Sequence, residues 1–185
     1  MKKYIYLVVL SILLPNYFPE NESLLNYTHV IFEWSQIQDS DLYEIQISNN
    51  SDFTNIVSSA TTHSLVYIEK NSIDWDTEYF WRIRGVNTDS NTNFTWSPIH
   101  SFSTTNQRSN ASSTTYFEND YSNGITIFSS FLDYFSAAID QNGNEIWNTG
   151  NTNLVYYTEN NMQFYGTQFG SNDSELPGVM FSLDN

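Results

Sequence analysis

Two tryptophans in the first half of the chain are the side chains best suited to hold a ligand. Trp75 lies between two aspartates, and Trp96 is followed by Ser97 and Pro98, so both stand in polar segments between apolar runs. An exposed indole ring offers a flat apolar face on which a sugar ring can stack. We therefore predict Trp75 and Trp96 as binding residues for a glycan. The competing interpretation is packing in or near a core, the commoner role of large aromatic side chains.

Residues suited to acid–base or nucleophilic chemistry are few. The chain has three histidines, His29, His63 and His100, and no His, Lys or Arg follows Arg108. It contains no cysteine, no Gly-rich phosphate loop, no His/Cys metal spacing and no Gly-x-Ser-x-Gly nucleophile elbow. An isolated histidine beside strand residues is usually an ordinary packed or exposed side chain. We therefore predict no catalytic residue and no cofactor.

Two aspartate pairs have the spacing of oxygen ligands in a loop: Asp39 with Asp41, and Asp74 with Asp76. Neither pair is accompanied by the glycine and the further spaced acids of a dedicated calcium loop. Solvated loop charges are the favoured interpretation, and no metal site is predicted.

The elements that must position these residues are predicted to be β-strands, and the fold class all-β. Val, Ile, Thr, Tyr, Phe and Trp dominate the apolar set, and no segment after residue 20 has the 3.6-residue apolar period of a helix. From Tyr27 to Thr105 the chain alternates apolar and polar residues in short runs. Three runs put their apolar residues on one face: Val30, Phe32 and Trp34; Tyr43, Ile45 and Ile47; Tyr79, Trp81 and Ile83. Seven short strands at about 10-residue spacing predict a β-sandwich over residues 19–105.

This region resembles the fibronectin type III modules, which have an immunoglobulin-like fold. The resemblance rests on Trp34, on Tyr43-Glu-Ile-Gln-Ile-Ser48, on Ile73-Asp-Trp-Asp-Thr-Glu-Tyr79 and on Trp96-Ser97. It implies that the Tyr79 hydroxyl bonds back to an upstream backbone group. It also implies that Arg82 and Arg84 can stack with tryptophans in a structural ladder. Trp75 and Asp76 stand where the family usually has Pro and Gly, so we expect a different turn there.

A polar linker is predicted over residues 106–115, followed by a second β-rich region, residues 116–185. Its expected strands include 124–128, 134–139 and 145–147, and Asp140-Gln-Asn-Gly143 supplies the residues of a tight turn, with Gly143 free to take a positive φ. The lead-in to Asp140 returns before Asp184, ~44 positions later, which is a spacing typical of propeller blades. We therefore predict residues 116–185 to be the first blade or blades of a truncated propeller, with downstream blades missing.

The run Ala138-Ile-Asp-Gln-Asn-Gly-Asn-Glu-Ile-Trp147 resembles the blade hairpin of the bacterial arylsulfotransferases. That resemblance implies a parent activity of sulfate transfer from an aryl sulfate to a phenol through a sulfated histidine. This chain departs from it, because no His, Lys or Arg follows Arg108. We expect this chain to be inactive alone. We also expect residues 116–185 to be loosely ordered, aggregation-prone or dependent on a partner, because a single blade leaves both its faces open.

The N-terminus predicts a signal peptide over residues 1–18. Lys2 and Lys3 precede an uncharged apolar run, Tyr4 to Leu14, which is too short to span a bilayer. The mature chain would keep four basic residues against 21 acidic ones, a net charge of −17. Such a surface repels nucleic acid, so we predict no nucleic-acid partner and no membrane span in the mature chain.

The combined expectation is a secreted, periplasmic or cell-surface protein without catalytic activity. It would consist of an accessory fibronectin type III-like module and the start of an arylsulfotransferase-like propeller. The alternative is an extracellular adhesion or glycan-binding protein, with a glycan or a protein as its partner.

Overall fold

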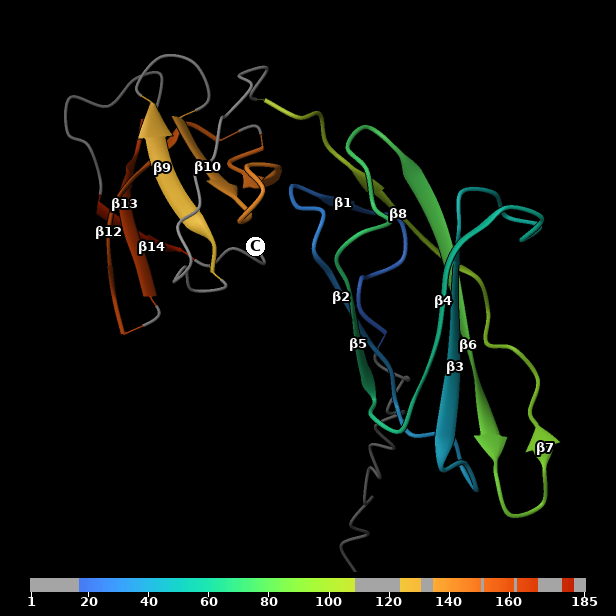
Figure 1. Cartoon of the computed structure of the whole chain (residues 1–185). Helices are drawn as coiled ribbons and strands as arrows, with labels where there is room; N and C mark the ends of the chain where they lie inside the picture. The colour runs from blue at the N-terminus through green and yellow to red at the C-terminus, as the bar shows by residue number, and fades with distance from the viewer. Residues whose placement is uncertain are drawn as a thin grey trace, which may run out of the picture.

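The computed structural model describes residues 17–108, 124–130, 135–150, 152–161, 163–169 and 178–181. All regular elements in these ranges are β-strands, as the all-β prediction requires. Within the same ranges, no helix is long and apolar enough to cross a membrane. The strands fall into an N-terminal unit, residues 17–108, and a C-terminal unit, formed by the described residues from 124 to 181, which lie side by side in Figure 1.

The N-terminal unit has one six-stranded and one two-stranded sheet. The six-stranded sheet has the order β1-β8-β6-β3-β4, with β7 paired to β6. Its strands are β1 (Ser23–Leu25), β3 (Leu42–Ser48), β4 (Ile56–Thr62), β6 (Glu78–Asn87), β7 (Thr92–Asn93) and β8 (His100–Thr104). The other sheet pairs β2 (Val30–Glu33) with β5 (Val66–Glu69) in antiparallel register. All pairs in the larger sheet are antiparallel except β1 with β8.

The core of this unit forms where the two sheets face each other, because successive side chains of a strand point to opposite sides. On β6, Trp81 and Ile83 are fully buried, while Arg82 and Arg84 lie partly exposed on the other face. Rings from the two sheets meet between them, with the centroid of Phe32 5.2 Å from that of Trp81. The inward faces predicted for these strands are confirmed: Val30, Phe32, Trp34, Tyr43, Ile45, Ile47, Tyr79, Trp81 and Ile83 are all buried.

Tyr79 makes the bond expected of it. Its hydroxyl accepts a hydrogen bond from the backbone N–H of Asp74 at 2.9 Å, and its ring stacks on Phe102 with centroids 5.5 Å apart. Burial raises the pKa of this hydroxyl, so it stays protonated. The bond ties the turn around Trp75 to the start of β6. Within this turn, Asp76 has a left-handed backbone conformation, with a positive φ of 54°.

The C-terminal unit consists of two three-stranded antiparallel sheets. One has the order β11-β10-β9 and contains β9 (Thr126–Ser130), β10 (Phe135–Ile139) and β11 (Glu145–Asn148). The other has the order β12-β13-β14 and contains β12 (Leu154–Asn160), β13 (Gln163–Gln168) and β14 (Gly178–Phe181). Aromatic rings hold the sheets together, and Trp147 of β11 stacks on Phe181 of β14 with centroids 5.9 Å apart. Ser136 of β10 adds a hydrogen bond between the sheets, because its hydroxyl donates to the backbone oxygen of Leu154 at 2.8 Å.

The turn between β10 and β11 has the chemistry that its sequence predicts. Asp140 Oδ1 accepts hydrogen bonds from the backbone N–H groups of Asn142 at 2.8 Å and Asn144 at 2.9 Å. Its other oxygen, Oδ2, accepts one from the Asn144 side chain at 3.0 Å. Gly143 has a φ of 83°, a left-handed conformation that glycine adopts without strain. The turn assigned to Asp140–Gly143 is therefore confirmed.

Residues 26–28, between β1 and β2, join the two units through their main chains. Tyr27 forms an antiparallel bridge with Trp147. On either side of it, Thr28 N–H donates to the oxygen of Ile146 at 2.9 Å, and Asn148 N–H donates to the oxygen of Asn26 at 3.0 Å. Residues 26–28 thus extend the β11 edge of the β9–β11 sheet by one β-bridge and its two flanking main-chain hydrogen bonds.

The predicted linker is fixed to the joint at its beginning. Asn148 is fully buried, and its side chain donates to the oxygen of Asn106 at 3.2 Å and to the Glu145 carboxylate at 2.7 Å. The same carboxylate accepts the backbone N–H of Arg108 at 3.1 Å, and Arg108 donates to the Thr149 hydroxyl at 2.9 Å. Asn106 and Arg108 are therefore bonded to the buried pair Asn148 and Glu145, while residues 109–115 of the predicted linker lie outside the described residues.

Three other expectations fall partly or wholly outside the described ranges. Residues 1–16 of the predicted signal peptide are outside them, whereas Tyr17 and Phe18 are described and lie against the N-terminal unit. The ring of Tyr17 is 6.0 Å from Trp81, and Phe18 bridges Glu33. Asp184, the second member of the repeat, lies outside the described residues, as do residues 116–123 at the predicted start of the propeller.

Candidate functional site

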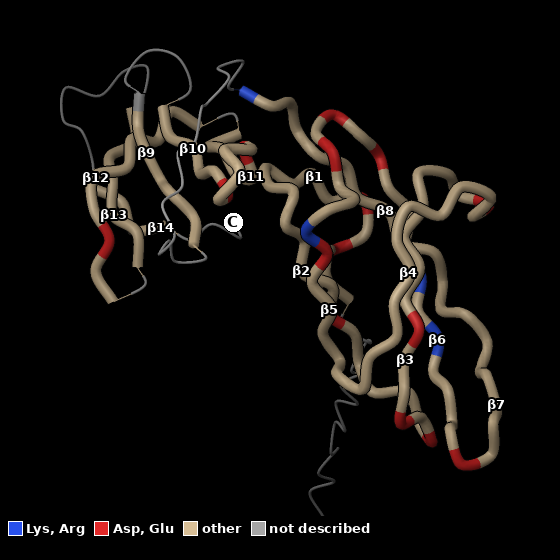
Figure 2. Tube along the Cα trace, viewed as in Figure 1, with Lys and Arg blue, Asp and Glu red and all other residues tan. Residues whose placement is uncertain are grey.

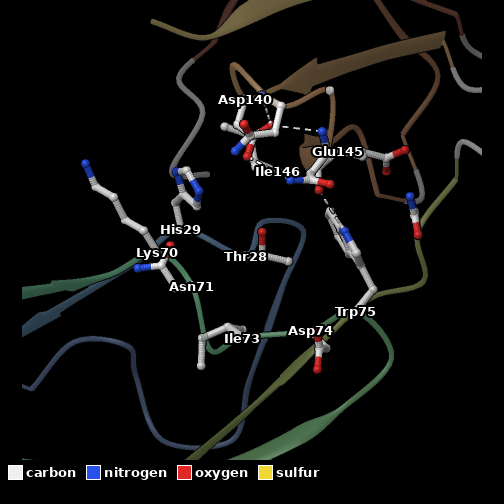
Figure 3. Close-up of a pocket in the computed structure, with 14 residues that line it drawn as sticks. Thr28, His29, Lys70, Asn71, Ile73, Asp74, Trp75, Asp140, Glu145 and Ile146 are labelled. Atoms are coloured by element: carbon white, nitrogen blue, oxygen red, sulfur yellow. Dashed lines mark hydrogen bonds between the residues drawn. The ribbon is translucent and has the colours of Figure 1, made fainter. Parts of the chain in front are cut away.

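A cleft of about 590 Å³ opens where the two units meet (Figure 3). One wall is formed by the residues just before β2 and by the loop after β5, and the other wall by the turn between β10 and β11. Its lining is mostly polar and includes Thr28, His29, Lys70, Asn71, Ile73, Asp74, Trp75, Gln107, Asp140, Asn142, Gly143, Asn144, Glu145 and Ile146. A volume of this size suits a small ligand.

His29 and Lys70 supply hydrogen-bond donors on the N-terminal side. Figure 3 shows His29 between Lys70 and the turn that carries Asp140. Burial lowers the pKa of His29, and the charge of Lys70 lowers it further, against a smaller opposing effect of Asp140 and Glu69. The imidazole is therefore neutral at pH 7. Within the described residues, neither the imidazole nor the Lys70 ammonium has a hydrogen-bond partner.

Asp140 supplies a carboxylate on the opposite wall. Burial raises the pKa of this group, but the hydrogen bonds from Asn144 and Asn142 outweigh that effect and hold the pKa below its ordinary value. The carboxylate is therefore charged at neutral pH and fixed in one orientation by its own turn. It can accept hydrogen bonds from a ligand without rearranging.

Trp75 lies in this cleft, at the end near Glu145. Its indole N–H donates to the backbone oxygen of Glu145 at 3.0 Å, a bond that Figure 3 draws between the units. Its own backbone oxygen accepts from the Thr77 hydroxyl at 2.9 Å. The ring is half-buried, and the bond to Glu145 holds its orientation. Trp75 therefore makes a structural contact across the joint and keeps part of its ring exposed at the cleft.

Trp96 lies elsewhere, on the outer face of the six-stranded sheet. The guanidinium carbons of Arg82 and Arg84 lie 4.4 and 4.6 Å from its ring centroid, and Arg82 also lies 3.9 Å from the ring of Phe53. Arg82 donates two hydrogen bonds to Gln46, at 2.7 and 3.1 Å, and Arg84 forms an ion pair with Glu44. The predicted stacking of arginines on a tryptophan is thus present. Trp75 and Trp96 do not share one surface.

The remaining chemistry-bearing residues are dispersed. His63 Nδ1 lies 2.7 Å from the backbone oxygen of Asp41, at the far end of the sheet from the cleft. The His100 ring lies 4.3 Å from that of Tyr17 and 5.0 Å from that of Trp81, and burial lowers its pKa. The Asp41 carboxylate accepts the Thr88 backbone N–H and hydroxyl. Within the described residues, no three His, Asp or Glu side chains are grouped to hold a metal ion.

Lys70 and Asn71 were not singled out by the sequence. They directly follow the end of β5, where polar residues are common. They line a cleft only because the hairpin of β10 and β11 lies opposite them. A weak clue was the scarcity of basic residues: Lys70 is the only lysine after Lys3. In Figure 2, basic positions are sparse and acidic positions are spread over both units.

The fold and the cleft together define an all-β protein with a polar cleft between two strand-rich units. A comparison with protein-family models finds no match, and neither does a comparison with curated proteins. Among solved structures, the chain is similar to an α-L-rhamnosidase from Dictyoglumus thermophilum, with 12% sequence identity and a TM-score of 0.41. The match covers 68% of this chain and spans only 16% of the length of that chain.

Proposed function

We propose that this chain is a non-catalytic extracellular protein in which a fibronectin type III-like β-sandwich acts as an accessory module. The module holds the first strands of a propeller-like unit in a fixed position. The observation that carries the proposal is the main-chain pairing of residues 26–28 with β11, which makes the module part of the neighbouring sheet.

The sandwich assignment draws support from the pairing pattern and from Tyr79. A sandwich module separates β2 and β5 from the sheet that contains β3, β6 and β8, which is the arrangement found here. The bond from Asp74 N–H to the Tyr79 hydroxyl is the corner expected of such modules. Arg82 and Arg84, which stack on Trp96, are also bonded to Gln46 and Glu44, respectively. These contacts favour a structural role for the two arginines.

We propose no catalytic role for the cleft. Among the described residues, no hydrogen bond orients the ring of His29. Asp140 accepts three hydrogen bonds within its own turn. Incubation of the whole chain with 4-nitrophenyl sulfate and phenol should give no sulfate transfer. Transfer that disappears in His29→Ala would contradict the proposal.

Amide hydrogen exchange tests the accessory role directly. Thr28→Pro removes the N–H that donates to Ile146, whereas Thr28→Ser keeps it and serves as the matched control. Residues 145–148 should exchange at least about tenfold faster in Thr28→Pro than in Thr28→Ser, because an edge pair of the sheet is lost. Amides of the β6 core should be unchanged. Equal exchange at 145–148 in the two variants would show that the module does not hold these strands.

A second candidate function, glycan binding, is favoured by one observation. The cleft brings Trp75 together with amide, carboxylate and ammonium side chains.

A further inference from the structure

The cleft between the units has unpaired hydrogen-bonding side chains on its N-terminal wall, a carboxylate on the facing wall and an aromatic ring at one end. Lys70 and His29 have no hydrogen-bond partner within the described residues, and the Asn71 side chain forms none there either. The Asp140 turn faces them (Figure 3). We infer that this cleft binds a neutral, polyhydroxylated ligand, namely a sugar residue of a glycan. The inference rests on the proposed joint between the units, because the cleft forms only where residues 26–28 pair with β11.

The charges of the lining argue for a neutral ligand. Lys70 is the one cationic side chain among the lining residues, against the carboxylates of Asp74 and Asp140; the Glu145 carboxylate is buried and bonded to Asn148 and Arg108. An anionic ligand would gain from Lys70 but would face these carboxylates in a strongly acidic protein. A cationic ligand would face Lys70. Hydroxyl groups suit both walls, because each hydroxyl can donate to a carboxylate and accept from an ammonium or amide.

The groups that would contact the sugar are already held in place. The orientation of Trp75 is fixed by its bond to the Glu145 oxygen, and the carboxylate of Asp140 is fixed by three hydrogen bonds within its turn. Groups that are ordered before binding lose less conformational freedom when the ligand arrives. Trp75 can therefore serve as a stacking face for the apolar side of a sugar ring, while Lys70 and Asp140 bond to its hydroxyls.

The joint is essential to this site because neither unit contains it alone. Ile73 and Thr28 come from the N-terminal unit, and Ile146 comes from β11. The experiment must therefore use the whole chain. Residues 17–185, labelled with ¹⁵N, are titrated with cellobiose, maltose, lactose and mannobiose up to about 50 mM, and with glucuronate as a charged control. The expected result is saturable shifts, for at least one disaccharide, at the Trp75 indole N–H and at residues 70–71 and 140–144.

Four variants separate sugar binding from structural effects. Trp75→Ala should weaken binding at least about tenfold, whereas Trp75→Phe keeps a stacking face and should restore most of it. Lys70→Met, which breaks no hydrogen bond among the described residues, should weaken binding about tenfold. Trp96→Ala removes the second tryptophan that the sequence predicted as a binding residue, which lies outside the cleft, and should leave the affinity unchanged. The dispersion of the remaining amide signals reports whether each variant is folded.

Three results would overturn the inference. They are the absence of saturable shifts in the cleft with all four disaccharides, tighter binding of glucuronate than of the neutral sugars, and an affinity that Lys70→Met and folded Trp75→Ala leave unchanged. None of these results bears on the exchange test with Thr28→Pro, so the failure of the sugar site is distinguishable from the failure of the accessory role.

Discussion

Asn148 is the residue whose replacement tests the joint between the two units most directly. Its side chain is fully buried and makes three hydrogen bonds: to Asn106, to Glu145 and from the N–H of Gly150, the last at 2.8 Å. Asn148→Ala removes all three, but leaves the main-chain bonds of residue 148 available. The variant therefore separates the polar network from the strand pairing.

The size of the effect follows from these bonds. Each contributes about 1 kcal/mol net, and a buried group left without a partner costs about 1–3 kcal/mol more than an exposed one. The Glu145 carboxylate is 5% exposed and keeps the Arg108 N–H as a partner, which limits the additional cost. We expect a loss of about 3 kcal/mol in the free energy of unfolding of the C-terminal unit. For a chain of this length, the melting temperature should fall by about 6–12 °C.

Urea unfolding followed by tryptophan fluorescence measures this loss, since Trp147 lies beside the replaced residue. Amide exchange at residues 106–108 and 145–150 should increase in parallel, because these segments share the network. Asn153→Ala is the matched control: its side chain is exposed and makes no hydrogen bond within the described part of the chain. A loss in Asn148→Ala that is no larger than in Asn153→Ala, or unchanged exchange at 106–108, would refute the reasoning.

Two further predictions concern the N-terminal unit. Tyr79→Phe removes the acceptor of the Asp74 N–H and should destabilise the unit by about 1 kcal/mol in urea unfolding, and a Tyr43→Phe control, whose hydroxyl has no partner in the described structure, should cost less. The second prediction concerns Glu69, which is 4% exposed. Burial raises the pKa of its carboxyl. The hydrogen bonds that this carboxyl accepts outweigh burial and hold the pKa below its ordinary 4.5; their donors are Ser58, Asn71, Tyr67 and Ser72. Because the folded-state pKa is lowered, its stabilisation is present above pH 4.5 and is lost as the pH falls below that value through the folded-state pKa. Unfolding free energies measured against pH should therefore fall less steeply below pH 4.5 in Glu69→Gln than in the natural chain, and parallel curves would count against this account.

Local sequence patterns predicted the strands and turns well. Alternation placed Trp81 and Ile83 inward and Arg82 outward, because a side chain's face in a strand is set by its position alone. Asp140 and Gly143 predicted their turn, because the hydrogen bonds and the positive φ involve residues only a few positions apart. The bond of the Tyr79 hydroxyl to an upstream backbone group was expected from the resemblance to fibronectin type III modules, and the structure gives the Asp74 N–H as its partner.

The candidate site could not be predicted in the same way. The cleft exists because residues 26–28 pair with β11, and nothing in Asn26 or Trp147 indicates a partner so distant in the sequence. Trp75 was singled out as a ligand residue, but its bond to Glu145 arises only from that pairing. Trp96 was grouped with it by residue type, although the two rings lie on different surfaces. Residue type predicts what a side chain can do, whereas long-range pairing decides which side chains act together.

The pairing of residues 26–28 with β11 also sets an order of events during synthesis. Asn26 and Asn148 are separated by 122 positions, so at ~5–20 residues per second the segment emerges from the ribosome about 6–24 s before its partner. β1 is translated just before that interval, and β2 to β8 are translated within it. The module can therefore fold first and present a short, unpaired edge as a template for the hairpin of β10 and β11. Substitutions at residues 26–28 would then act on the yield of newly made protein before they act on the stability of the finished one.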